Sequence, residues 1–122
     1  MSLPRILLID DDSEVLDRLL QVVEGKMEIV GASGVDEVLE HLQRSKWDLL
    51  LTDVNLLLVR GDRLIELVRE RLGGQTPPVV YFSSADESEL AELTASTGAA
   101  GFLSKGTRSA DLLDRISEFV SV

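Results

Sequence analysis

Short, uninterrupted apolar segments alternate five times along this chain with longer segments whose apolar residues recur every three or four positions. The apolar segments predict β-strands and the periodic segments predict α-helices. The strands are expected at Arg5–Ile9, Met27–Ala32, Asp48–Thr52, Val79–Phe82 and Gly101–Ser104. The helices are expected at Ser13–Glu24, Asp36–Ser45, Asp62–Leu72, Glu87–Thr97 and Ser109–Val120. This alternation predicts an α/β fold, with a parallel sheet covered by helices on both faces.

The chain is expected to form one doubly wound (βα)5 domain over residues 1–122. The first, third and fourth apolar segments are continuous rather than alternating, which is typical of strands buried on both faces. A length of 122 residues suits a single domain, and the sequence contains no internal repeat or linker.

Composition excludes several classes of function. The chain has no cysteine, so it can form neither disulfides nor thiolate metal sites. The formal net charge of −10 argues against direct binding of nucleic acid, which needs a basic face. No apolar segment is long enough to span a membrane and none is typical of a secretory signal, so a cytoplasmic protein is expected.

Polar residues follow four of the five predicted strands. The carboxyl ends of parallel strands meet at one edge of the sheet, where doubly wound folds bind their ligands. The residues expected at this edge are Asp10, Asp11, Asp12, Asp53, Asn55, Ser83, Ser84 and Lys105. Asp12 and Ser84 are better explained as residues that begin the following helices, so the remaining residues form the candidate site.

The predicted edge of the sheet suits phosphoryl chemistry. Adjacent carboxylates are unfavourable unless a positive charge neutralises them, and Mg²⁺ prefers such oxygen ligands. A carboxylate can also attack phosphorus and form an aspartyl phosphate. Phosphoryl transfer mainly requires positioning and neutralisation of charge, which Mg²⁺, the Lys105 ammonium and the Ser83 hydroxyl could supply.

With these motifs in this order, the chain resembles the response regulator receiver domain of two-component signal transduction, the CheY-like superfamily. The resemblance rests on the pair Asp10–Asp11, on the aspartate in "DLLLTDVN", on the first serine after "VVYF" and on the lysine in "GFLSK". The intervals also match: 42 or 43 residues from the pair to Asp53, 30 to Ser83 and 22 to Lys105. The resemblance covers nearly the whole chain and implies a flavodoxin-like sheet with strand order 2-1-3-4-5.

The resemblance assigns roles to individual residues. It implies that Asp53 is the phosphoacceptor, and that Asp10, Asp11, Asp53 and the backbone carbonyl of Asn55 hold Mg²⁺. Asp11 would be the more direct ligand of the acidic pair.

Three further positions have implied roles in the response to phosphorylation. Lys105 would pair with a phosphoryl oxygen. Ser83 would hydrogen-bond the phosphoryl group and move toward it. Phe102 would be the aromatic residue that rotates together with Ser83, although a place in the core explains Phe102 equally well and is compatible with that role.

The implied function is a signalling module rather than a metabolic enzyme. A sensor histidine kinase or a histidine phosphotransfer protein would donate a phosphoryl group to Asp53. The modified domain would then bind an effector domain or downstream protein, or form a homodimer, without binding nucleic acid or membrane itself. Ala85, two residues after Ser83, cannot orient an attacking water, so slow self-dephosphorylation is expected.

Three other functions compete with this one. A receiver-like interaction domain that works without phosphorylation is the main alternative. A hydrolase with an aspartate nucleophile would need an acid/base carboxylate at the position that Asn55 occupies. A flavin- or nucleotide-binding domain would need a glycine-rich loop after the first strand, which this chain lacks.

The sequence departs from the family at two places. Gly106 replaces the usual proline after the lysine, so we expect a trans Lys105–Gly106 peptide bond and a more mobile loop. Four apolar residues, 56–59, and then Arg60 precede Gly61, where the family has a Met-Pro-Gly type of segment with an acidic residue before the glycine. These apolar residues either contact a partner or second copy, or fold back under the next helix.

Overall fold

The computed structural model describes residues 3–120 and shows a five-stranded parallel sheet in the order β2-β1-β3-β4-β5. The strands are β1 (Arg5–Ile9), β2 (Glu28–Ala32), β3 (Leu49–Thr52), β4 (Val79–Ser83) and β5 (Gly101–Ser104). The helices are α1 (Ser13–Val22), α2 (Val35–Arg44), α3 (Gly61–Leu72), α4 (Glu87–Thr97) and α5 (Ser109–Ser117), with a short 3-10 helix η1 (Gly73–Gln75). The predicted α/β fold and its strand order are confirmed; residues 1–2 and 121–122 of the expected domain lie outside the described part.

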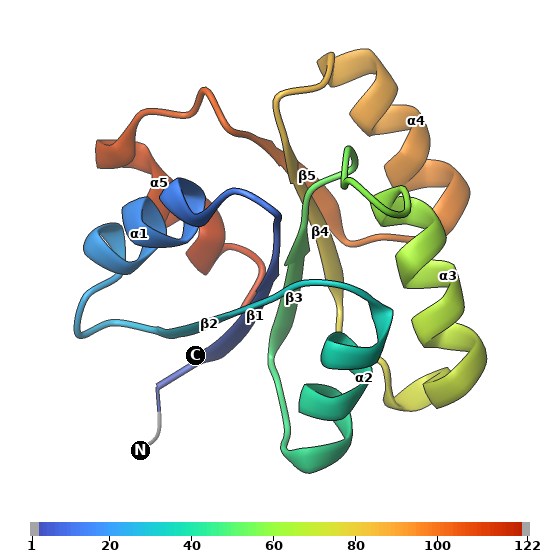
Figure 1. Ribbon diagram of the computed structural model, residues 1–122. Coiled ribbons are helices and arrows are strands. Elements are labelled where there is room, and N and C mark those ends of the chain that lie inside the picture. The colour runs from blue at the N-terminus through green and yellow to red at the C-terminus, as the bar shows by residue number, and fades with distance from the viewer. Residues whose placement is uncertain (1–2, 121–122) are drawn as a thin grey trace.

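Two hydrophobic cores lie on opposite faces of the sheet. Helices α1 and α5 cover one face, and α2, α3 and α4 cover the other (Figure 1). Along β1, Ile6 and Leu8 pack under α1 and α5, while Leu7 and Ile9 pack on the opposite side. All four side chains are almost fully buried. Burial on both faces explains why this strand is apolar at every position.

The observed elements agree with the predicted ones to within one or two residues, except at α5. That helix ends at Ser117 rather than Val120, although Val120 still packs into the core formed with α1. The expected cap at Ser84 is also wrong, because the side chain of Asp86 accepts the first backbone hydrogen bond of α4. The prediction for Asp12 is confirmed, since its Oδ1 accepts a hydrogen bond from the Glu14 amide at 2.9 Å.

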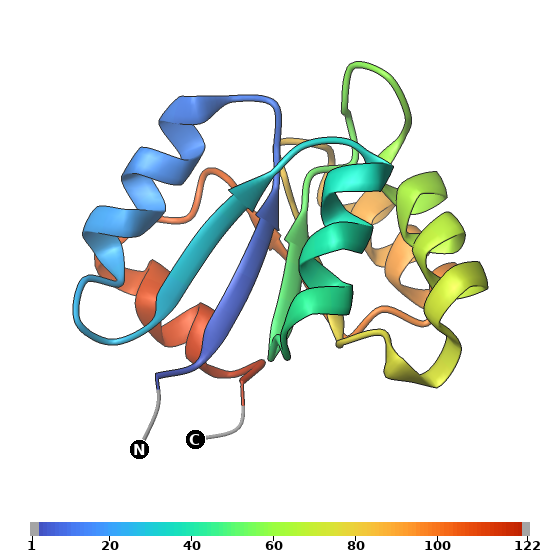
Figure 2. The same cartoon turned by 60° about the horizontal axis from the view of Figure 1, so that its bottom comes forward.

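Strand register brings the polar residues to one edge. Ile9 of β1 pairs with Thr52 of β3, and Ser83 of β4 pairs with Ser104 of β5. The strands therefore end at nearly the same level, and the loops that follow them cluster there (Figure 2). In the described part of the chain, no helix has both the length and the apolar character needed to cross a membrane.

Candidate functional site

Asp53 follows β3 directly and its backbone is fixed by two neighbours. Its amide donates to the carbonyl of Ile9 in β1 at 3.0 Å. Its own carbonyl accepts a hydrogen bond from the Thr52 hydroxyl at 2.9 Å. Only 9% of the residue is exposed. The phosphoacceptor candidate is thus held by the sheet, with its carboxylate directed to the loop edge.

Lys105 joins the carboxylates of two strands. Its Nζ donates to Asp53 Oδ2 at 2.8 Å and lies 2.7 Å from Asp10 Oδ2. All three side chains are largely buried, with Asp10 the most enclosed. Water screens such contacts less than it screens ion pairs at the surface, so the ammonium is held between the two carboxylates.

Burial and the ion pair act in opposite directions on the titration of these groups. Burial alone would raise the pKa of Asp53, but the hydrogen bond and charge of Lys105, with help from the Ser83 hydroxyl, leave that pKa below its usual value. Burial alone would lower the pKa of Lys105, yet Asp10 and Asp53 raise it above its usual value. Asp53 is therefore ionised at neutral pH and Lys105 is charged.

The remaining acidic residues and the Asn55 backbone surround Asp53. Asp10 Oδ1 accepts the amide of Asp12 at 2.9 Å, and Asp11 Oδ2 accepts the amide of Leu57 at 2.6 Å. The Asn55 amide lies 3.3 Å from Asp53 Oδ1. Asp10, Asp11 and Asp12 also line a hollow of about 340 Å³ beside this cluster.

The oxygen atoms around Asp53 suit a divalent cation, although the carboxylates do not enclose one without added ligands such as water. Asp10, Asp11, Asp53 and Lys105 together carry a formal charge of −2. Asp10 Oδ2 is buried without a well-directed hydrogen bond, since the lysine neutralises its charge but is poorly aligned with it. Within residues 3–120, no three acidic or histidine side chains converge closely enough to hold a metal. Mg²⁺ commonly uses one or two carboxylates and completes its shell with water, so the residues fit this ion.

Ser83 and Phe102 lie where the sequence places them. Ser83 is the fully buried last residue of β4, and its Oγ accepts the Ala85 amide at 3.2 Å. Phe102 of β5 pairs with Tyr81 and packs, partly exposed, against the core beneath α2, α3 and α4. The prediction of a core position for Phe102 is confirmed, while its rotation stays a prediction.

Comparison with known proteins decides the family. The family model of the response regulator receiver domain matches residues 6–117. The chain belongs to the response regulator receiver domain family. A receiver domain protein (CheY-like) from Methanospirillum hungatei JF-1 is similar in structure, with 28% identity and a TM-score of 0.79 over 96% of this chain and 93% of that one.

Relatives in sequence include both short and long proteins. An uncharacterized 14.6 kDa protein from Leptolyngbya boryana is 29% identical over 93% of this chain and 88% of its own length. The sensor histidine kinase TmoS from Ectopseudomonas mendocina is 24% identical over 98% of this chain. This receiver domain spans only 12% of TmoS.

Gly61 is a residue of the site that the sequence reasoning missed. It begins α3, and its amide donates to the carbonyl of Val54 at 2.8 Å. A Cβ at this position would lie 1.9 Å from the carbonyl oxygen of Asp53. Glycine is required here because the first turn of α3 packs directly against the backbone of Asp53. The signals in the sequence were a glycine at the start of a predicted helix, eight positions after Asp53, and its match to the glycine of the family's Met-Pro-Gly type of segment.

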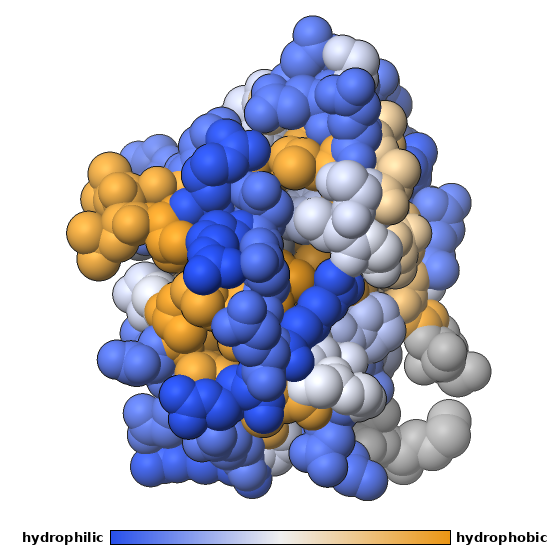
Figure 3. Space-filling model, turned by 90° about the vertical axis from the view of Figure 1, so that its right-hand side faces the viewer, coloured by the Kyte–Doolittle hydropathy of each residue, from blue (hydrophilic) through white to orange (hydrophobic). Residues whose placement is uncertain are grey.

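The four apolar residues before α3 do not all behave alike: two fold back against the core, and two are exposed and could contact a partner. Leu56 and Val59 pack against the core, as the interpretation of folding back requires. Leu57 and Leu58 are 87% and 96% exposed, so that interpretation is wrong for them. Apolar side chains project at the edge of a largely hydrophilic face of the receiver domain (Figure 3). The two leucines therefore remain a candidate contact surface.

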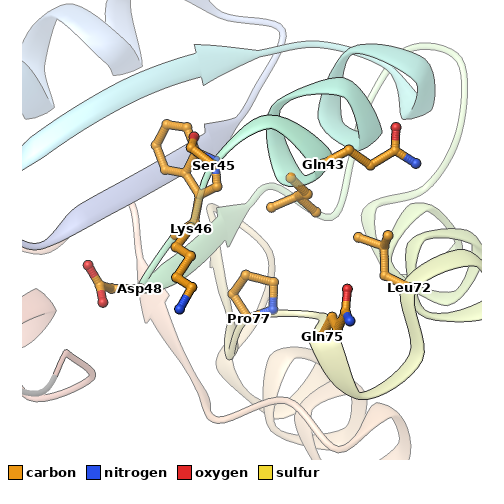
Figure 4. A pocket seen from close by; sticks show the side chains of 9 residues that line it. Gln43, Ser45, Lys46, Asp48, Leu72, Gln75 and Pro77 are labelled. Carbon is orange, nitrogen blue, oxygen red and sulfur yellow. The ribbon is translucent and has the colours of Figure 1, made fainter.

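Another hollow, of about 640 Å³, lies at the opposite edge of the sheet from Asp53. Side chains from the end of α2, from the segment before β3 and from the end of α3 surround it (Figure 4). Trp47 is buried in its wall, and its Nε1 donates to the carbonyl of His41 at 3.0 Å. None of the residues of the candidate site lines this hollow, so the hollow is separate from that site.

Proposed function

We propose that this receiver domain accepts a phosphoryl group on Asp53 in a Mg²⁺-dependent reaction and thereby changes its affinity for a partner. The observation that supports this most directly is the contact of Lys105 with both Asp53 and Asp10. It places a buried cation beside an ionised aspartate, where a phosphoryl oxygen would need neutralisation.

The reaction would proceed by direct attack of the Asp53 carboxylate on phosphorus. An oxygen–phosphorus bond forms, the bond between phosphorus and the leaving group breaks, and the leaving group takes the electron pair. Asp10, Asp11 and Asp53 would hold Mg²⁺ through one or two direct carboxylate ligands and through bound waters, together with the carbonyl of Asn55, and the ion would neutralise charge on the phosphoryl oxygens. Lys105 and Ser83 would contact the same group from β5 and β4.

The change would spread through the strands that carry these contacts. The amide of Lys105 donates to the carbonyl of Ser83 at 2.9 Å, so the ends of β4 and β5 are coupled. A shift of Ser83 toward the phosphoryl group would alter the packing of Phe102 and the surface of α4, β5 and α5. Such a shift between two states is a common way to change a binding surface.

The phosphoryl donor would be a sensor histidine kinase or a histidine phosphotransfer protein in the cytoplasm. Downstream partners would be an effector domain, another protein or a second copy of this chain. The domain would be a signalling switch rather than a metabolic enzyme. Ala85 offers no polar side chain to orient water near Ser83, so the phosphorylated form would persist.

Labelling with a small phosphodonor tests this function. The purified protein is incubated with Mg²⁺ and acetyl phosphate, and intact mass is measured for one added, hydrolytically labile phosphoryl group. The wild type and the control Asp114→Asn, which alters an exposed carboxylate on α5, should be labelled, whereas Asp53→Asn should not. Binding of Mg²⁺ without labelling of the wild type would contradict the proposal and would favour an interaction domain that works without phosphorylation.

A further inference from the structure

The loop between β5 and α5 is held from outside by one side chain of α1. The guanidinium of Arg18 donates through Nη1 to the carbonyl of Lys105 at 2.8 Å and through Nε to Ser109 Oγ at 3.2 Å. Its Nη2 donates to the carbonyl of Thr107. The planar guanidinium of Arg18 thus binds two residues of the loop, Lys105 and Thr107, and the first residue of α5, Ser109.

We propose that Arg18 is a positioning residue for Lys105, a role that rests on the proposed phosphoryl transfer to Asp53. Among the described residues, Arg18 forms no hydrogen bond or ion pair with Asp53 or Asp10, and instead binds the backbone carbonyl of Lys105. Fixing the carbonyl of Lys105 restricts where its long side chain begins. The ammonium then reaches the two carboxylates without searching many conformations.

Helix α1, which carries Arg18, is packed firmly against the core. The neighbouring Leu19 is fully buried, and Val15, Leu16 and Val22 of the same helix pack against the core shared with α5. Arginine also presents five donors in a fixed geometry, so three simultaneous bonds demand little further ordering of the side chain. Arg18 can therefore transmit the position of α1 to the loop.

The loop needs such a restraint because its own sequence supplies little. Gly106 has great conformational freedom, and all described peptide bonds are trans, which confirms the prediction for the Lys105–Gly106 bond. At Gly106 and Thr107 the local contacts come from Ser104: its Oγ accepts the Gly106 amide and its carbonyl accepts the Thr107 amide, both at 3.0 Å. The bonds from Arg18 argue against the expected mobility, since they connect the loop to a different element.

A double-mutant cycle tests this role. Phosphorylation by acetyl phosphate and Mg²⁺ is timed for the wild type, Arg18→Met, Lys105→Met and the double variant. Arg18→Met keeps an apolar side chain but removes the three bonds, and we expect a rate lower by roughly tenfold, since small displacements of catalytic groups are costly. If Arg18 acts through Lys105, the double variant should be no slower than Lys105→Met.

The matched control is Arg44→Met, which breaks an exposed ion pair with Glu40 on α2 and should leave the rate unchanged. Hydrogen exchange of residues 105–109 provides a readout independent of phosphorylation, and it should accelerate in Arg18→Met alone. Arg18→Lys, which keeps the charge but not the fork, should give an intermediate rate. Thermal unfolding identifies any variant that fails to fold. If Arg18→Met does not fold, Ser109→Ala is used in its place; it removes only one of the three acceptors of Arg18, so a smaller decrease in the rate is expected.

Two results would overturn the role of Arg18. One is unchanged exchange of the loop in Arg18→Met. The other is a double variant whose slowing equals the product of the single effects, because Arg18 would then act independently of Lys105. If the wild type itself takes no label, the proposed function fails, while the exchange experiment still decides whether Arg18 holds the loop.

Discussion

Lys105 and Asp53 form a partly buried ion pair across the end of the sheet, with 2.8 Å between Nζ and Oδ2. The same ammonium lies 2.7 Å from Asp10, so one lysine pairs with a carboxylate that follows β1 and with one that follows β3. Lys105 offsets the charge of Asp10, while Asp11 and Asp12 accept the amides of Leu57 and Glu14. The arrival of a cation or a phosphoryl group must therefore redistribute the contacts of Lys105.

Removal of the ammonium should slow labelling of Asp53. Lys105→Met keeps most of the side-chain volume, but no cation then faces the phosphoryl oxygens. Hydrogen bonds to charged groups contribute about 1.5–3 kcal/mol, so we expect labelling by acetyl phosphate to slow by about 10- to 100-fold. The control Lys46→Met alters a lysine at the opposite edge of the sheet and should label at the rate of the wild type. Equal rates for both variants would contradict the role of Lys105.

The ion pair should also make the free energy of unfolding depend on pH. The pKa of Asp53 lies below its usual value of 3.8, so its ionised form stabilises the fold above that pH. That stabilisation is lost as the pH falls through the lowered pKa. The pKa of Lys105 lies above its usual value of 10.5, so the contribution of the lysine is complete below that value and disappears only as the pH rises through the raised pKa.

Urea unfolding of the wild type and Asp53→Asn at several pH values between 6 and 2 measures this dependence. The free energy of unfolding of the wild type should fall more steeply toward acid than that of the variant. Parallel curves would show that the pKa of Asp53 is not lowered by folding.

Local patterns in the sequence predicted the α/β fold and the edge where most of the candidate site lies, while the strand order followed from the resemblance to the receiver family. Continuous apolar segments followed by polar residues identify buried strands and the edge where Asp10, Asp53 and Lys105 meet. The roles of Arg18 and Gly61 were not predictable in this way. Arg18 contacts residues 87 and 89 positions away, and the need for glycine at 61 arises only from the packing of α3 against the backbone of Asp53.

The start of α3 should tolerate no side chain. In Gly61→Ala the new methyl group would meet the Asp53 carbonyl at 1.9 Å, which forces the helix or Asp53 to shift. Such overpacking typically costs about 1–3 kcal/mol, so we expect a lower free energy of unfolding together with slower labelling. Gly74→Ala is the matched control, because a Cβ there meets no atom within 4 Å. Its unfolding free energy should stay within about 0.5 kcal/mol of the wild type.

The exposed leucines should matter for partners and not for folding. Leu57 and Leu58 are 87% and 96% exposed, so replacing both with serine removes little buried apolar surface. The double variant should unfold at the temperature of the wild type and accept phosphate from acetyl phosphate at the same rate. Its affinity for a histidine phosphotransfer protein or kinase that phosphorylates the wild type, measured by calorimetry, should fall. Leu3→Ser, which alters a leucine that is 45% exposed before β1, is the control. Unchanged affinity of the double variant would show that such a donor does not contact the leucines.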